Sequence, residues 1–244
     1  MEIKQGDIFL LGKHKLMCGD SLKLTDVNKL LDNHQADMVF MDPPYNVDYC
    51  PEERRKGGRT IKSLGRIMND TNFDVTRVMD LLKTGIVKGA VYMCCGTNQY
   101  PKIYPWVQKH IKIRPTFIIW VKNGFSILAR DYHSAYEPIC YFYFDKKKFR
   151  GSRGQTDVWH FKRRNTSKYV HPTMKPVALV QRAICNSSDE RDLILDLFGG
   201  SGTTMIACEN TNRRCNMMEL DPKYVRIIIE RWESLTGDKA VKLC

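Results

Sequence analysis

Along most of the chain, short apolar runs alternate with segments whose apolar residues recur at helical spacing. The apolar runs predict buried strands at residues 38–41, 90–95, 117–121, 139–144, 193–197 and 215–220. Strands that alternate with helices indicate an α/β fold in which a mostly parallel sheet is covered by helices on both faces. We find no internal repeat and no change of composition that would mark a linker, so we expect a single domain over residues 1–244.

The boundaries of several helices are also visible in the sequence. Apolar residues within 27–31 fall on one helical face, and Asp74 is placed to be the N-cap of the amphipathic segment that follows it. Segments 176–185 and 222–235 each begin with a proline, which is favourable at the first position of a helix because its missing N–H would be unbonded there. We therefore expect four helices in these regions.

Composition first excludes several classes of protein. The hydrophobic fraction of 43% is ordinary for a globular chain, which excludes extensive disorder. No strictly apolar run exceeds six residues and the start lacks a secretory pattern, so we expect a cytoplasmic protein without membrane contact. None of the nine cysteines forms a Cys-x-x-Cys pair, so we expect neither a zinc site nor a disulfide framework and assign no metal ligand.

The net charge of +12 is concentrated in two short segments. Residues 51–66 hold six basic and two acidic side chains, and residues 145–168 hold nine basic and two acidic ones. Together they account for +11, so the remaining 204 residues are nearly neutral. Both segments are rich in glycine or lack an apolar period, which predicts loops, and their charge favours a polyanionic partner.

One predicted strand ends in Asp42-Pro43-Pro44-Tyr45. Two successive prolines stop a strand and stiffen the turn, and neither carries an N–H. Asp42 and the Pro43 carbonyl can then accept both protons of an amino group, while Tyr45 offers a flat ring on which a base can stack. The pattern indicates a site that holds the exocyclic amine of a nucleobase.

A second predicted strand runs into Asp196-Leu197-Phe198-Gly199-Gly200-Ser201-Gly202-Thr203-Thr204, a glycine-rich turn followed by a helix that begins near Thr203. Glycines allow close approach of a ligand to the backbone. The spelling fits neither the Walker phosphate loop nor the dinucleotide fingerprint. Glu219 closes the next strand, seventeen residues after Gly202, where a ribose-binding carboxylate belongs. We therefore expect a nucleoside-like cofactor that needs no phosphate site.

These motifs resemble those of the amino-group DNA methyltransferases of the permuted beta class, in which the Asp-Pro-Pro-Tyr motif precedes the cofactor motif. The resemblance covers essentially the whole chain and includes Gly19-Asp20 at a strand end and His171-Pro172-Thr173-Met174-Lys175-Pro176. It implies a Rossmann-like methyltransferase sheet, mostly parallel with an antiparallel hairpin, and S-adenosylmethionine as cofactor. The cofactor site that it implies consists of Asp20, Thr173, Lys175, Asp196, Phe198, Gly200, Ser201, Gly202, Thr203 and Glu219.

The resemblance implies direct methyl transfer to an exocyclic amine of a base flipped out of duplex DNA, with Asp42, Pro43, Pro44 and Tyr45 as the catalytic residues. Asp rather than Ser at the first motif position favours N6 of adenine over N4 of cytosine in this family. A cytosine-C5 enzyme would need a cysteine after a proline, which the chain lacks. The alternatives left open are an N4-cytosine enzyme, methylation of RNA or of a glutamine amide, and a DNA-binding module that has lost catalysis.

The two basic segments are the expected contacts to double-stranded DNA. Residues 51–66 lie just after Tyr45 and are expected to form a mobile loop over the base, and residues at about 145–170 are expected to form the target-recognition insertion, with Trp159 either stacking or anchoring a hairpin. The expected DNA-binding residues are Arg54, Arg55, Lys56, Arg59, Lys146, Lys147, Lys148, Arg150, Arg153, Arg163 and Arg164. The sequence leaves open the recognition site, a bacterial or phage origin, a link to restriction, and a homodimer, which is common in this family.

Overall fold

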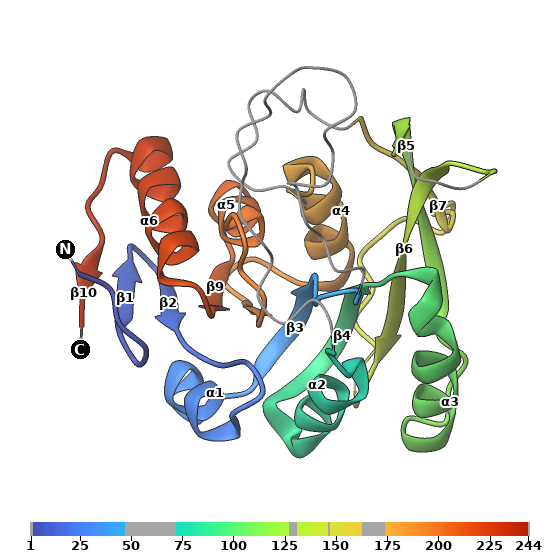
Figure 1. Ribbon diagram of the computed structural model, residues 1–244, viewed down its shortest axis with the longest axis horizontal. Helices are drawn as coiled ribbons and strands as arrows, with labels where there is room; N and C mark the ends of the chain where they lie inside the picture. The colour runs from blue at the N-terminus through green and yellow to red at the C-terminus, as the bar shows by residue number, and fades with distance from the viewer. Residues whose placement is uncertain (1, 47–71, 127–130, 146, 163–173, 244) are drawn as a thin grey trace.

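The computed structural model describes residues 2–46, 72–126, 131–145, 147–162 and 174–243. These residues form a ten-stranded sheet flanked by helices, with the strand order β10-β1-β2-β9-β8-β3-β4-β6-β5-β7 (Figure 1). The strands are β1 (Ile8–Leu11), β2 (His14–Cys18), β3 (Ala36–Met41), β4 (Val87–Cys94), β5 (Thr116–Ser126), β6 (Ser134–Tyr143), β7 (Val158–His160), β8 (Leu193–Asp196), β9 (Arg214–Glu219) and β10 (Val241–Lys242). The helices are α1 (Leu24–Leu31), α2 (Val75–Leu81), η2 (Leu82–Ile86), η3 (Thr97–Gln99), α3 (Tyr100–His110), α4 (Val177–Ser187), α5 (Thr203–Asn210) and α6 (Pro222–Thr236).

The centre of the sheet is parallel, and antiparallel pairs flank it on both sides, although the edge strand β7 pairs with β5 in parallel. Strands β2, β9, β8, β3 and β4 pair in parallel with their neighbours in that order. A hairpin of β1 and β2 lies on one side, and β6 joins β4 to β5 in antiparallel fashion on the other. The predicted mostly parallel α/β sheet with an antiparallel hairpin is confirmed.

Two helical layers cover the sheet. Helices α1, α2 and α3 lie on one face, and α4, α5 and α6 lie on the other (Figure 1). Each layer has its own apolar core: Val27, Val78 and Ile103 belong to the first, whereas Leu179 and Val225 belong to the second. The central strands are therefore buried on both sides, which explains why they read as continuous apolar runs in the sequence.

The predicted helix boundaries are close to the observed ones. Asp74 caps α2 by accepting a hydrogen bond from the Thr76 backbone N–H. Pro222 occupies the first turn of α6, as expected, whereas Pro176 is the extended residue just before α4 rather than its first helical residue. Helix α3 was not predicted, because Pro101 and Pro105 interrupt its sequence and obscure its apolar face.

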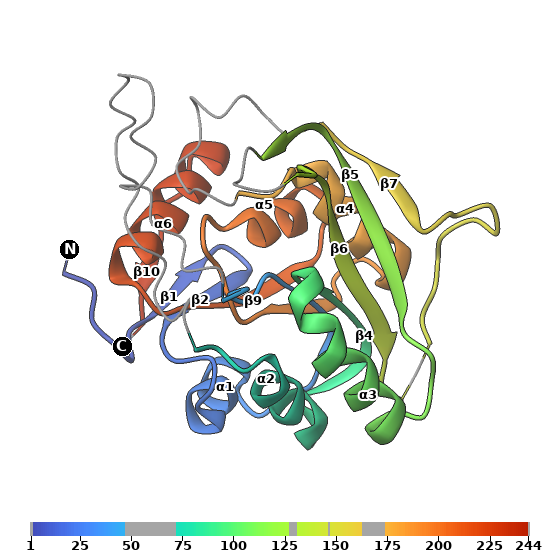
Figure 2. The ribbon, with the colours of Figure 1, turned by 45° about the vertical axis from the view of Figure 1, so that its right-hand side comes forward.

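The long β5–β6 hairpin and the short strand β7 form one edge of the sheet (Figure 2). Within the described part of the chain, no helix has the length and apolar character needed to cross a membrane.

Candidate active site

A pocket opens at the carboxyl ends of the parallel strands. Asp20 follows β2, Asp42 follows β3, Asp196 ends β8 and Glu219 ends β9, and all four side chains line this pocket. Because these strands run in parallel and are neighbours, the tertiary structure gathers at one edge four carboxylates that lie far apart in the sequence. Open α/β sheets bind their ligands at this edge.

The turn after β3 is held by two amide side chains from the segment that follows β4. The Gln99 amide donates to the carbonyl of Pro44 over 3.0 Å, and the Asn98 amide donates to the carbonyl of Tyr45 over 3.0 Å. No described residue donates a hydrogen bond to the carbonyl of Pro43. The carbonyls of Pro44 and Tyr45 are therefore occupied, whereas the Pro43 carbonyl has no donor among the described residues, and Pro43 lines the pocket together with Asp42.

Both oxygens of the Asp42 carboxylate have a partner. The Tyr45 hydroxyl donates to Oδ1 over 2.6 Å, and the Lys175 ammonium donates to Oδ2 over 2.5 Å. Lys175 lies just before α4 and is buried, and its ammonium also lies 5.6 Å from the centre of the Tyr45 ring. The sequence assigned Lys175 to the cofactor, whereas its hydrogen bonds connect it to the Asp-Pro-Pro-Tyr turn.

Two further charged residues extend this cluster into the β5–β6 hairpin. Glu137 of β6 places Oε2 3.1 Å from the Lys175 ammonium and Oε1 2.5 Å from the ammonium of Lys122 on β5. Burial alone would lower the pKa of Lys175, but the charges of Asp42 and Glu137 outweigh it and raise that pKa above its usual value. Sequence reasoning assigned no role to Glu137 or Lys122, because only the tertiary structure brings Glu137 to the pocket and Lys122 against Glu137.

The glycine-rich turn after β8 forms the floor of the pocket. Asp196 accepts from the backbone N–H of Phe198 over 3.0 Å. Gly200 and Gly202 both have positive φ, of 52° and 78°, and a Cβ on Gly202 would lie 2.9 Å from Ile228. Glycine is therefore required at position 202 both for its backbone conformation and for the approach of α6.

Glu219 is fixed at the tip of β9 by two backbone donors. The N–H of Gly200 donates to Oε2 over 2.7 Å, and that of Asp221 donates to Oε1 over 2.9 Å. Burial raises the pKa of Glu219 to about 7, and burial likewise raises the pKa of Asp196 to about 7. The pocket thus places a fixed hydrogen-bond acceptor where a sugar hydroxyl can reach it.

The remaining predicted cofactor residues also lie at the pocket. Asp20, Phe198, Ser201 and Thr203 line it, and the Ser201 carbonyl accepts from Arg231 of α6 over 2.8 Å. Carboxylate acceptors, an aromatic ring and a glycine floor together suit a nucleoside that carries an amino acid moiety. Thr173 lies outside the described residues.

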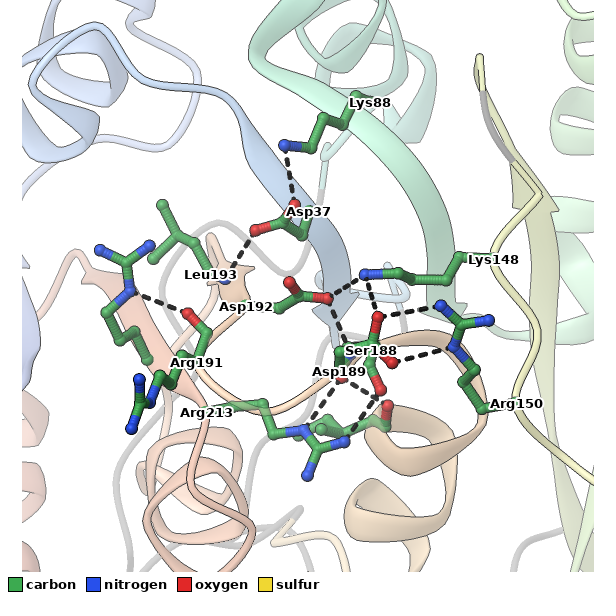
Figure 3. A network of polar contacts seen from close by, with 12 residues as sticks. Asp37, Lys88, Lys148, Arg150, Ser188, Asp189, Arg191, Asp192, Leu193 and Arg213 are labelled. Atoms are coloured by element: carbon green, nitrogen blue, oxygen red, sulfur yellow. Dashed lines mark hydrogen bonds and ion pairs between the residues drawn. The ribbon is translucent and has the colours of Figure 1, made fainter.

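The basic residues Lys148 and Arg150 are not brought to this pocket. Lys148 contacts Asp189 and Asp192 over 2.8 Å and 2.6 Å, and Arg150 pairs with Asp189 over 2.9 Å (Figure 3). Asp192 directly precedes β8, whose other end carries Asp196. These ion pairs therefore lie at the amino-terminal edge of the sheet, opposite the pocket, and their charges are compensated within the protein.

The aromatic residues of the same segment divide between core and surface. Trp159 is buried, donates its indole N–H to the Thr156 carbonyl over 3.0 Å and packs under the Arg182 guanidinium. Of the two roles considered for Trp159, anchoring is the one that these contacts describe. Phe149 is exposed and Phe161 partly buried.

The other predicted DNA-binding residues fall into two groups. Lys147 and Arg153 are described by the structure and are exposed. The other predicted basic contacts lie outside the described residues, namely Arg54, Arg55, Lys56, Arg59, Lys146, Arg163 and Arg164.

Sequence comparison identifies relatives over most of the chain. It is 38% identical over 255 residues to the type II methyltransferase M1.MboII of Moraxella bovis, which covers 87% of this chain and 92% of that protein. It is 25% identical over 252 residues to the DNA adenine methyltransferase YhdJ of Escherichia coli, covering 88% of this chain and 82% of that one.

Solved structures share the fold. The M1.HpyAVI complex with S-adenosylmethionine superposes with a TM-score of 0.66 at 21% identity, covering 88% of this chain and 98% of that one. The cytosine-N4-specific PvuII DNA methyltransferase superposes with a TM-score of 0.64 at 16% identity, covering 93% and 91%. The family model described as DNA methylase, of the N6/N4 type, matches residues 36–230. The chain therefore belongs to the N6/N4 DNA methylase family.

Proposed function

We propose that this protein transfers the methyl group of S-adenosylmethionine to the exocyclic N6 amine of an adenine flipped out of duplex DNA at a specific site. The observation that carries the proposal is the turn after β3, in which Asp42 and Pro43 line a pocket suited to a nucleoside and no described residue donates to the Pro43 carbonyl. Two acceptors at this position suit the two protons of an amino group.

The cofactor supplies a sulfonium-activated methyl group. Glu219 would hold the ribose hydroxyls, Asp20 the adenine end and the turn around Gly200 the remainder, since these residues line the same pocket. Lys175 contacts Asp42, so it would lie between the cofactor site and the base site rather than in the cofactor site alone.

The residues of the turn would act on the target amine. The lone pair of an aromatic amine is delocalised into its ring, which makes it a poor nucleophile. By accepting both amine protons, Asp42 and the Pro43 carbonyl would localise that lone pair and aim it at the methyl group. Positioning and electrostatic stabilisation of the developing charge supply the rate enhancement, and the transfer needs no covalent enzyme intermediate.

Adenine is the proposed target because Asp42 occupies the first motif position, where this family more often has Asp in adenine enzymes and Ser in cytosine enzymes. The second candidate is N4 of cytosine, whose amine presents the same two protons. The structural similarity to a cytosine-N4-specific enzyme keeps that candidate in the test.

The proposed DNA contacts come from two basic segments whose described neighbours in the sequence line the pocket. Asn46 and Phe73 are joined by two hydrogen bonds, of 2.5 Å and 2.6 Å, and Phe73 lines the pocket. Asn46 and Phe73, which flank the segment that holds four of the predicted basic contacts, therefore lie together at the pocket. Met174, at the end of the segment that contains Arg163 and Arg164, also lines it. We assign the phosphate contacts to Arg54, Arg55, Lys56, Arg59, Arg163 and Arg164.

The test is incubation of the purified protein with genomic DNA and labelled S-adenosylmethionine, followed by nucleoside analysis and methylation-aware sequencing. Label in N6-methyladenine at one sequence context supports the proposal. Label in N4-methylcytosine would favour the second candidate, cytosine. If unmethylated DNA takes up no label, both candidates are contradicted.

We also propose that the reaction takes place in the cytoplasm of a bacterium or of a phage-infected cell. The mass of the active species, measured by analytical ultracentrifugation, tests whether the enzyme is a homodimer.

A further inference from the structure

Four buried or half-buried side chains of alternating charge form a line from the β5–β6 hairpin to the catalytic turn. The order is Lys122, Glu137, Lys175 and Asp42, with successive contacts of 2.5 Å, 3.1 Å and 2.5 Å. Each carboxylate uses its two oxygens for different partners: Glu137 faces one lysine with each, and Asp42 faces Lys175 and the Tyr45 hydroxyl. Each oxygen of Asp42 thus already accepts one hydrogen bond before any substrate arrives.

A carboxylate has about four acceptor positions, so a target amine can either add to these two contacts or replace one of them. The Tyr45 hydroxyl sits three residues from Asp42 on the same rigid turn, whereas Lys175 reaches Asp42 from another element and has a second anion, Glu137, within 3.1 Å. A buried ammonium that is left without a counter-ion suffers a large desolvation penalty, which a neighbouring carboxylate removes. Lys175 is therefore the partner that can yield at low cost.

We propose that Glu137 is a positioning residue that retains the Lys175 ammonium when the target amine replaces it at Asp42, and that Lys122 fixes Glu137 for this purpose. This inference rests on the proposed function. Without the Glu137 charge, Asp42 is the sole anionic partner of Lys175 in this line. The target amine must then displace Lys175 from Asp42 although no second carboxylate in the line can receive the ammonium. Glu137 touches neither substrate nor cofactor in this scheme and acts through Lys175.

The first variant to test is Glu137→Gln, which keeps the side-chain shape and one acceptor oxygen for Lys122 but turns an amide NH₂ toward Lys175. We expect the single-turnover rate of methyl transfer to fall by about 10- to 100-fold, the range of coupling between residues in one charge network. The dissociation constant for S-adenosylmethionine should stay close to that of the wild type. The melting temperature should fall, because Gln removes the negative charge that two buried ammonium groups share, so the rates are compared at a temperature at which both proteins are folded.

The matched control is Glu233→Gln. Glu233 has nearly the same side-chain exposure, 20% against 18%, and also pairs with a lysine, Lys239, but it lies on α6 away from the pocket. Its rate should equal that of the wild type. A loss of cofactor affinity in Glu137→Gln, or an unchanged rate in the folded variant, would indicate a structural role and overturn the proposal.

A double-mutant cycle with Lys175→Met separates a direct from an indirect role. If Glu137 acts through Lys175, its replacement costs little once Lys175 is absent, so the two effects are strongly non-additive. If Glu137→Gln lowers the rate by the same factor in the wild type and in Lys175→Met, the proposal is overturned. If Lys175→Met leaves too little activity to measure, the proposal is tested by the single variant Glu137→Gln, in which the rate should fall while cofactor affinity is kept. A wild-type protein that methylates no DNA would instead contradict the proposed function itself.

Discussion

The hydroxyl of Tyr45 donates a hydrogen bond of 2.6 Å to Oδ1 of Asp42, three residues earlier on the same turn. Desolvation and the negative charge of Asp42 raise the pKa of Tyr45, so the phenol keeps its proton and remains a donor. Tyr45 therefore has two separable parts: the hydroxyl orients the catalytic carboxylate, and the ring is the proposed surface on which the base stacks.

Replacement of Tyr45 separates those parts. Tyr45→Phe keeps the ring and removes the bond to Asp42, so we expect a rate reduction of about 3- to 10-fold, the size of one ordinary hydrogen bond. Tyr45→Ala also removes stacking, which is worth about 1–3 kcal/mol per base, so its reduction should be greater by at least about fivefold. Single-turnover rates on saturating DNA measure both. Equal reductions in the two variants would show that the ring does not hold the base.

Asp42→Ala should abolish methyl transfer and preserve cofactor binding. The carboxylate accepts an amine proton in the proposed step, and such groups contribute about 10²- to 10⁴-fold to rate. The cofactor contacts assigned to Glu219 and the Gly200 turn are left intact. Calorimetry with S-adenosylmethionine and a methylation assay check the two expectations, and near-normal turnover would remove Asp42 from the site.

Gln99→Ala should impair catalysis from outside the pocket. Gln99 is 3% exposed, donates to the Pro44 carbonyl and accepts from the Gly96 N–H over 3.1 Å. Its removal leaves both backbone groups unsatisfied, at about 1–3 kcal/mol, and loosens the turn that carries Asp42. We expect a lower melting temperature and a lower rate. Gln108→Ala, at an exposed position of α3, is the control and should change neither.

The stability of the cofactor-free protein should depend on the ionisation of Asp196. Burial raises the pKa of this carboxyl from 3.8 to about 7, so the folded state holds its proton more tightly than the unfolded state does. Ionisation of Asp196 therefore destabilises the fold as pH rises from about 4 to about 7. Relative to the wild type, Asp196→Asn should gain stability over this interval, by an amount on the order of a few kcal/mol at most.

Urea denaturation at pH 5 and pH 8 measures the difference for Asp196→Asn. Asp189→Asn is the control: hydrogen bonds from Arg150 and Lys148 lower the pKa of Asp189, so its carboxylate is ionised at both pH values and the variant should lose the same stability at each. That carboxylate stabilises the fold once ionised, and its contribution disappears as pH falls toward the lowered pKa. A pH-independent effect of Asp196→Asn would contradict the buried, protonated state.

Salt dependence should distinguish the two groups of basic residues. Replacing Arg54, Arg55, Lys56 and Arg59 by Gln should reduce the slope of log K for DNA against log salt concentration by about 0.9 for each phosphate that the variant no longer neutralises. Arg150→Gln should leave the slope unchanged, because Arg150 is paired with Asp189 at the opposite edge of the sheet. Fluorescence anisotropy across a salt series gives both slopes. A slope that changes only in Arg150→Gln would show that DNA binds at the edge of the sheet that carries Arg150.

The sequence by itself determined the elements and the chemistry that local patterns encode. Buried parallel strands read as apolar runs, and the turns at Asp42 and Gly200 carry proline and glycine because their backbones demand them. The sheet class, the cofactor turn and Glu219 at the tip of its strand followed from these signals. Helix α3 did not, since two prolines mask its period.

Only the tertiary structure decided which charges meet. A run of lysines and arginines has the same sequence signature whether it faces DNA or folds back on acidic partners, and the tertiary structure placed Lys148 and Arg150 beside Asp189. The line from Lys122 through Glu137 and Lys175 to Asp42 likewise joins residues up to 133 positions apart. Electrostatic interaction depends on distance in space, which sequence separation does not specify, and the pairing of β5, β6 and β4 supplied it.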